Sequence, residues 1–165
     1  METIFFKGTE VHTYGDVPAA GSQAPDFELT KPDLSEVRLS DLRGRKVVLN
    51  VFPSLDTPVC AMSVRRFNKE ASARKDVAVV CVSEDLPFAI GRFCTLEGLE
   101  NVIGASAFRS PEFSKEYGLL MVDGPLKGLL ARAVIIIDET GKVIYRQLVD
   151  EITDEPDYEA AIAML

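Results

Sequence analysis

Histidine is almost absent from this sequence of 165 residues, in which His12 is the only example. His12 lies in a short alternating segment, far along the chain from any candidate nucleophile, which argues against a Ser-His-Asp or Cys-His site. The sequence contains no Cys-x-x-Cys or His-x-x-x-His pair, so the usual ligand spacings of a zinc site are missing. Neither glycine-rich nucleotide-binding motif occurs. The sequence therefore predicts no metal and no cofactor.

Positive charge is also scarce, because 18 Lys and Arg residues face 26 Asp and Glu residues and leave a formal net charge of −8. That balance argues against binding to nucleic-acid phosphates or to an anionic membrane surface. No basic start followed by a long apolar run is visible at the N-terminus, and the longest aliphatic run, residues 133–137, is too short to cross a bilayer. We therefore expect a cytoplasmic protein. In that compartment cysteines are more often catalytic, metal-binding or buried than joined in structural disulfides.

The order of the predicted elements favours an α/β fold. Apolar, β-branched runs at 46–52 and 77–83 predict strands buried on both faces, each followed by a helical segment that begins with proline. Further strands are expected at 3–7, 10–14, 27–29, 37–39, 132–138 and 143–148, and helices at 58–74, 87–95, 112–117 and 157–165. This order predicts a thioredoxin-like mixed sheet flanked by helices, with an added N-terminal β-hairpin, in a single domain over 1–165.

Cys60 is the most informative residue of the sequence. A predicted buried strand ends before Pro53, and Thr57 and Pro58 are residue types that favour the N-cap and the first position of a helix. Cys60 then lies in the first helical turn, where free N–H groups and the helix dipole favour the nucleophilic thiolate. The alternative is a buried structural cysteine at a helix start, and the residue types alone leave both interpretations open.

The residues around Cys60 resemble the active-site motif of the peroxiredoxins, in the form Pro53-x-x-x-Thr57-x-x-Cys60. The longer run from Ser54 to Asn68 is similar to the bacterial thiol peroxidase branch of that family, an atypical two-cysteine type. The similarity continues in three more runs, 85–94, 124–133 and 147–158. The resemblance covers nearly the whole chain and implies a thiol-dependent peroxidase with antioxidant activity.

The resemblance implies a role for each of five residues. Cys60 corresponds to the peroxidatic cysteine, whose thiolate reduces hydrogen peroxide or an alkyl hydroperoxide and becomes a sulfenic acid. Thr57 corresponds to the hydroxyl that holds the thiolate and the peroxide, and Arg132 to an active-site arginine supplied from a later strand. Pro53 corresponds to a shield over the site. Cys94 corresponds to the resolving cysteine, which forms an intrachain disulfide with Cys60.

The resemblance also implies partners for the reaction, with thioredoxin as the reductant and a second copy of the chain in a homodimer. We expect Cys60 and Cys94 to lie in the first turns of two separate helices, too far apart for a disulfide in the reduced fold. Formation of the disulfide is therefore expected to need local unwinding of about 57–62 and 88–96.

Two other functions remain open. A thiol–disulfide oxidoreductase shares the predicted fold, although Ser63 stands where its second cysteine would be. A redox sensor or holdase would use the oxidation of Cys60 to change its surface. Cys81 fits none of these functions, because it lies in the apolar strand at 77–83 and is interpreted as a small core residue.

Overall fold

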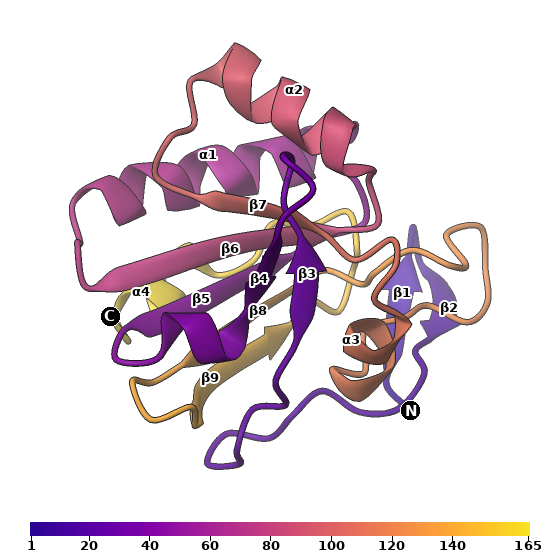
Figure 1. Ribbon diagram of the computed structural model, residues 1–165. Helices are drawn as coiled ribbons and strands as arrows, with labels where there is room; N and C mark the ends of the chain where they lie inside the picture. Colours follow the sequence, from indigo (N-terminus) through magenta and orange to yellow (C-terminus); the bar gives the residue numbers. More distant parts are fainter.

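A mixed sheet of seven strands forms the centre of the structure, a computed structural model that describes residues 1–165 apart from the side chain of Ser72. The strand order is β4-β3-β7-β6-β5-β8-β9 (Figure 1). The strands of this sheet are β3 (Glu28–Thr30), β4 (Glu36–Arg38), β5 (Lys46–Val51), β6 (Val77–Ser83), β7 (Ile103–Ser106), β8 (Ala133–Ile137) and β9 (Val143–Leu148). A separate antiparallel hairpin consists of β1 (Thr3–Phe6) and β2 (Thr9–His12).

Helices pack on both faces of this sheet. They are α1 (Pro58–Ser72), α2 (Pro87–Glu97), α3 (Pro111–Glu116) and α4 (Tyr158–Ile162), with a 3-10 helix, η1 (Leu39–Leu42). Proline occupies the start of α1, α2 and α3, where its missing N–H costs no intrahelical hydrogen bond. Among the described residues, no helix is both long and apolar enough to cross a bilayer.

The middle of the sheet is built from β-branched residues. Strand β5 pairs in parallel with β6 and antiparallel with β8, and the side chains of β6 and β8 are buried along their whole length. Successive side chains of a strand point to opposite faces, so strands covered on both sides need apolar residues at every position. The sequences Val-Ala-Val-Val-Cys-Val-Ser and Ala-Val-Ile-Ile-Ile meet that requirement except at Ser83, the last residue of β6.

Two apolar cores lie on the two faces of the sheet. One core packs α1, α2 and α4 against residues such as Val48 and Val79, and it contains both Cys60 and Cys81. The other core packs α3, η1 and the β1–β2 hairpin against the opposite face, through residues such as Leu49 and Val80 (Figure 1). The predicted mixed sheet, its flanking helices and the N-terminal hairpin are thus confirmed, with most boundaries shifted by one or two residues.

Strand β7 was not expected from the sequence, because Ile-Gly-Ala-Ser contains one residue that favours strands. The structure explains the small residues. A Cβ atom at Gly104 would lie 2.5 Å from Cγ2 of Ile90 and 3.5 Å from Sγ of Cys94, both on α2. Glycine at this position therefore lets α2 pack directly on the sheet.

Gly104→Ala is expected to lower the free energy of unfolding by about 1–3 kcal/mol, the usual range for over-packing a core. Urea denaturation of the purified variant measures this change. Ile90→Ala serves as the partner in a double-mutant cycle, because it removes the methyl group that the new Cβ meets. The two changes together should cost less than the sum of the single changes, and an additive cycle would contradict the steric explanation.

Candidate active site

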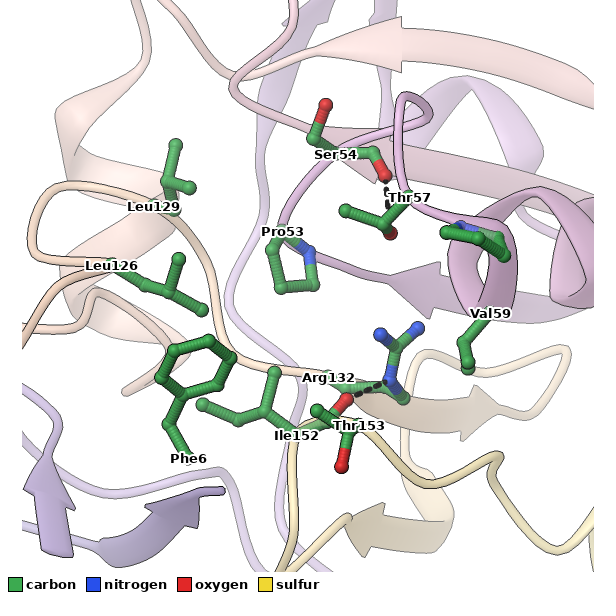
Figure 2. Close-up of a pocket in the computed structure, with 11 residues that line it drawn as sticks. Phe6, Pro53, Ser54, Thr57, Val59, Leu126, Leu129, Arg132, Ile152 and Thr153 are labelled. Atoms are coloured by element: carbon green, nitrogen blue, oxygen red, sulfur yellow. Dashed lines mark hydrogen bonds between the residues drawn. The ribbon is translucent and has the colours of Figure 1, made fainter. Parts of the chain in front are cut away.

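An apolar cavity of about 210 Å³ lies where the central sheet meets the start of α1 (Figure 2). Its wall combines the N-terminal hairpin, the turn after β5, the loop before β8 and the segment after β9. The lining residues are Phe6, Pro53, Ser54, Thr57, Pro58, Val59, Leu126, Leu129, Arg132, Ile152 and Thr153. Three residues predicted from the sequence, Pro53, Thr57 and Arg132, therefore meet in one cavity.

The turn between β5 and α1 is closed by hydrogen bonds to the Ser54 carbonyl oxygen. The Thr57 backbone N–H donates to it at 3.2 Å, and the Thr57 hydroxyl donates to it at 2.9 Å. Thr57 occupies the N-cap position with extended backbone, as predicted. Its side chain makes no capping hydrogen bond to the helix N–H groups, and its hydroxyl donates instead to the Ser54 carbonyl oxygen. A hydroxyl oxygen also carries two lone pairs, so Thr57 retains acceptor capacity at the cavity wall.

Cys60 is fully buried, with 0% of its surface exposed. It is the third residue of α1 and belongs to the apolar core that also includes Phe52 and Val64. Cys60 is not one of the residues described as lining the cavity, whereas its neighbour Val59 is. The structure therefore places the thiol in the predicted first turn of the helix, next to the residues of the cavity wall.

Arg132 is a buried cation at the cavity, with only 3% of its surface exposed. Its Nε donates to the backbone oxygen of Ile152 at 2.8 Å, whereas its buried Nη1 has no hydrogen-bond partner among the described residues. Figure 2 shows the guanidinium directed into the space between Pro53 and Val59. A buried polar group without a partner is costly, so this nitrogen is suited to an oxygen ligand that enters the cavity.

Cys94 lies elsewhere in the reduced structure. It is partly buried and lines a second cavity together with Pro32 and Gly104, and burial raises the pKa of its thiol. The expectation that Cys94 lies in the first turn of its helix is wrong, because α2 begins at Pro87 and Cys94 falls in its second half. The two predicted redox cysteines thus belong to different helices and different surroundings.

Cys81 has the features of an inert core residue. It is buried in β6, and desolvation raises the pKa of its thiol to about 12. The Asn50 side-chain amide donates to Cys81 Sγ at 3.8 Å and to the Ser63 hydroxyl at 3.2 Å. A thiol with such a high pKa is almost entirely protonated at neutral pH, and it is a poor nucleophile.

Sequence reasoning missed the apolar part of the cavity wall. The hairpin meets the C-terminal segment because Phe5 N–H donates to the Asp150 oxygen at 2.7 Å and Ile152 N–H donates to the Phe5 oxygen at 2.9 Å. No local spacing connects residues so distant in the chain. The family-like runs 124–133 and 147–158 were the available signal for three of the four missed residues, which are Phe6, Leu126, Leu129 and Ile152.

Comparisons with known proteins agree with this architecture. The Redoxin family model matches residues 19–162. The chain is 53% identical over 165 residues to the thiol peroxidase of Corynebacterium glutamicum, and 52% identical over 165 residues to that of Mycobacterium bovis. Each match spans 100% of this chain and 99% of the relative.

A solved structure shows the same fold. A peroxiredoxin-like protein from Aquifex aeolicus superposes with a TM-score of 0.94 at 42% identity, over 99% of this chain and 95% of the other. The thioredoxin-like arrangement expected from the element order is therefore confirmed. Given these matches along its whole length, the chain belongs to the redoxin family and, within it, to the thiol peroxidases, which are peroxiredoxin-type enzymes that reduce a peroxide at the expense of thiols.

Proposed function

We propose that this enzyme reduces hydrogen peroxide and alkyl hydroperoxides with Cys60 as its peroxidatic residue. The observation that carries the proposal is the buried, unpaired Nη1 of Arg132, which lies on the same cavity wall as Thr57. That wall includes the first residues of α1, the helix that holds Cys60. A donor for negative charge, an acceptor for a peroxide hydrogen and a thiol at a helix start are the groups that peroxide reduction needs.

In the first step, the Cys60 thiolate attacks the terminal oxygen of the hydroperoxide. An S–O bond forms as the O–O bond breaks, and the sulfur is oxidised by two electrons to a sulfenic acid. The leaving alkoxide or hydroxide takes up a proton and departs as alcohol or water. Arg132 Nη1 stabilises the negative charge that develops on oxygen, and the Thr57 oxygen accepts from the peroxide hydrogen. Pro53, which is buried, shields the site from bulk water.

In the second step, the Cys94 thiolate attacks the sulfenic sulfur of Cys60. The S–S bond forms as the S–O bond breaks, and the departing hydroxide takes up a proton to become water. Burial raises the pKa of Cys94 in the reduced fold, so few of these thiols are ionised before the helix opens. We propose that unwinding of the first turn of α1 and of most of α2, at about 57–62 and 88–96, both brings the two sulfur atoms together and activates Cys94.

We further propose that thioredoxin reduces the resulting disulfide, that the enzyme works as a homodimer and that it acts in the cytoplasm. Support for thioredoxin and for the homodimer comes from the resemblance to the thiol peroxidases, and the cytoplasmic location follows the expectation drawn from the sequence. We also propose that residues 1–165 form a single functional domain. A thiol–disulfide oxidoreductase is less well supported, because Ser63 stands where its second cysteine would be. The Ser63 side chain is buried and donates a hydrogen bond to the Cys60 carbonyl oxygen at 2.8 Å.

The proposed role of Cys60 is tested by peroxide consumption in the presence of thioredoxin, its reductase and NADPH. Cys60→Ser should abolish turnover, because no other thiol lies in the first turn of α1. Cys81→Ser is the matched control and should keep most of the activity. Loss of turnover only in Cys81→Ser would contradict the assignment. Insulin reduction without peroxide turnover would favour the oxidoreductase, and inactivity in both assays would favour the redox sensor or holdase.

Arg132→Met is expected to slow the reaction of the reduced enzyme with peroxide by about 100- to 1000-fold, the usual effect of losing one donor to a developing oxyanion. Stopped-flow mixing with a limiting peroxide concentration gives this rate, and a melting curve is recorded beside it. Arg132→Lys is the matched variant that retains the charge without the planar fork. An unchanged rate with a lowered melting temperature would assign Arg132 a structural role instead.

Phe6→Ala is expected to lower kcat/KM for a bulky organic hydroperoxide by about tenfold, which corresponds to losing part of the apolar contact of one aromatic ring. Hydrogen peroxide has no apolar group to contact the ring, so its kcat/KM should stay unchanged. Phe5→Ala is the matched control, because Phe5 is on the same strand but 40% exposed and outside the cavity wall. Equal losses for both peroxides would show that the wall does not select the substrate.

A further inference from the structure

The carboxylate of Asp85 connects two parts of the chain that the proposed reaction must move. Its Oδ1 accepts from the Ser54 hydroxyl at 2.7 Å, and its Oδ2 accepts from the Leu55 N–H at 2.8 Å and from the Ser83 hydroxyl at 2.7 Å. Ser54 and Leu55 belong to the turn before α1, whereas Asp85 lies between β6 and α2. The Asp85 side chain therefore links two segments. One is the turn before α1, which carries Cys60, and the other is the connection before α2, which carries Cys94.

The position of Thr57 depends on this carboxylate through Ser54. The Ser54 carbonyl oxygen accepts from both the N–H and the hydroxyl of Thr57, and the Ser54 hydroxyl accepts from the Asp56 N–H at 3.2 Å. Ser54 and Thr57 both line the apolar cavity. Asp85 thus fixes Ser54 from outside the turn, and Ser54 fixes the hydroxyl that faces the substrate.

Asp85 is itself anchored to the sheet rather than to the turn. Its backbone N–H donates to the Ser83 hydroxyl at 3.3 Å, and its backbone oxygen accepts from the Ser106 hydroxyl. Ser83 ends β6 and Ser106 ends β7, and both side chains are buried. The carboxylate is therefore a fixed point at the end of the sheet, and the turn at 54–57 is the part that can separate from it.

We propose that Asp85 is a positioning residue whose carboxylate holds the turn at 54–57, and with it the first turn of α1, in the peroxide-reactive arrangement and releases them when Cys60 pairs with Cys94. The inference rests on the proposed function. Hydrogen bonds to a carboxylate are stronger than those between neutral groups, so the hold is firm while all three bonds are made. Release of the turn at 54–57, together with unwinding of the first turn of α1, breaks the bonds from Ser54 and Leu55 but leaves the bond from Ser83 in place.

This role predicts opposite effects on the two chemical steps. Formation of the sulfenic acid requires Thr57 and the start of α1 in place, so weakening the hold slows it. Formation of the disulfide requires the same turn to leave its place, so weakening the hold accelerates it. A substitution that merely destabilises the fold is not expected to slow sulfenic acid formation and accelerate disulfide formation at the same time.

The experiment follows both steps in the full chain by rapid mixing with one equivalent of hydrogen peroxide. Samples are quenched with dimedone, which traps sulfenic acid, and mass spectrometry quantifies thiol, trapped sulfenic acid and Cys60–Cys94 disulfide. Mass spectrometry is used because the sequence contains no tryptophan to report by fluorescence. Melting curves of every variant are recorded in parallel.

Asp85→Asn should slow sulfenic acid formation by roughly tenfold or more, the effect of weakening hydrogen bonds to a charged group, and should accelerate the later disulfide step. Ser54→Ala removes the hydroxyl that donates to Asp85 and accepts from the Asp56 N–H, but leaves the bond from the Leu55 N–H to Asp85 in place. It should shift both rates in the same directions, so it serves as the second variant if Asp85→Asn does not fold. Asp56→Asn removes an exposed charge from the same turn and should change neither rate.

Two results would overturn the inference. If both steps slow together, or neither changes, in a folded Asp85→Asn or Ser54→Ala variant, Asp85 does not position the turn. If the wild type itself forms no sulfenic acid at Cys60 or no Cys60–Cys94 disulfide, the proposed function is wrong and the inference fails with it. The wild-type measurement therefore separates failure of the function from failure of the Asp85 role alone.

Discussion

The burial of one arginine is the constraint on which the site depends. A guanidinium that is almost removed from water needs partners, and a segment distant in the chain supplies one for Nε, whereas the buried Nη1 has none among the described residues. Arg132 Nε holds the Ile152 carbonyl oxygen, and the Arg132 carbonyl oxygen accepts from Val149 N–H at 3.0 Å. Ile152 in turn donates to the N-terminal hairpin. The buried arginine that lines the cavity therefore also holds part of its wall together.

The cavity combines an apolar lining with very few polar groups, and this combination fits the alkyl hydroperoxides proposed as substrates, which carry one polar group on an apolar body. Apolar side chains exclude water, which would otherwise compete for Arg132 and weaken its field. The polar groups that remain belong to the turn after β5, to Arg132 and to Thr153. The central sheet supports the first of these groups rigidly, since β5 pairs on both sides with buried strands.

The sequence was sufficient to predict the parts of the fold that depend on local pattern. The β-branched runs that form β5, β6 and β8 favour buried strands, and Thr57-Pro58 marks the start of α1. Strand β7 escaped prediction because the packing of Ile90, not strand propensity, selects Gly104. The contacts of Phe6 were also out of reach, because they depend on how distant segments meet rather than on neighbouring residues. The location of Cys94 was within reach, because the predicted helix at 87–95 already places it near the C-terminal end, in conflict with the expected first-turn position.

The hydrogen bonds between residue 5 and residues 150–152 mean that the site can be completed only late in the synthesis of the chain. Cys60 is synthesised well before Arg132 and Ile152, and the hairpin that carries Phe6 is made before all of them. A growing chain on the ribosome thus carries the thiol without the cavity, and the cavity closes only when the segment after β9 has emerged and docked on the hairpin. Cys60 is therefore present in the growing chain before the cavity beside it can form. The completed fold is the first state that contains both Cys60 and the closed cavity.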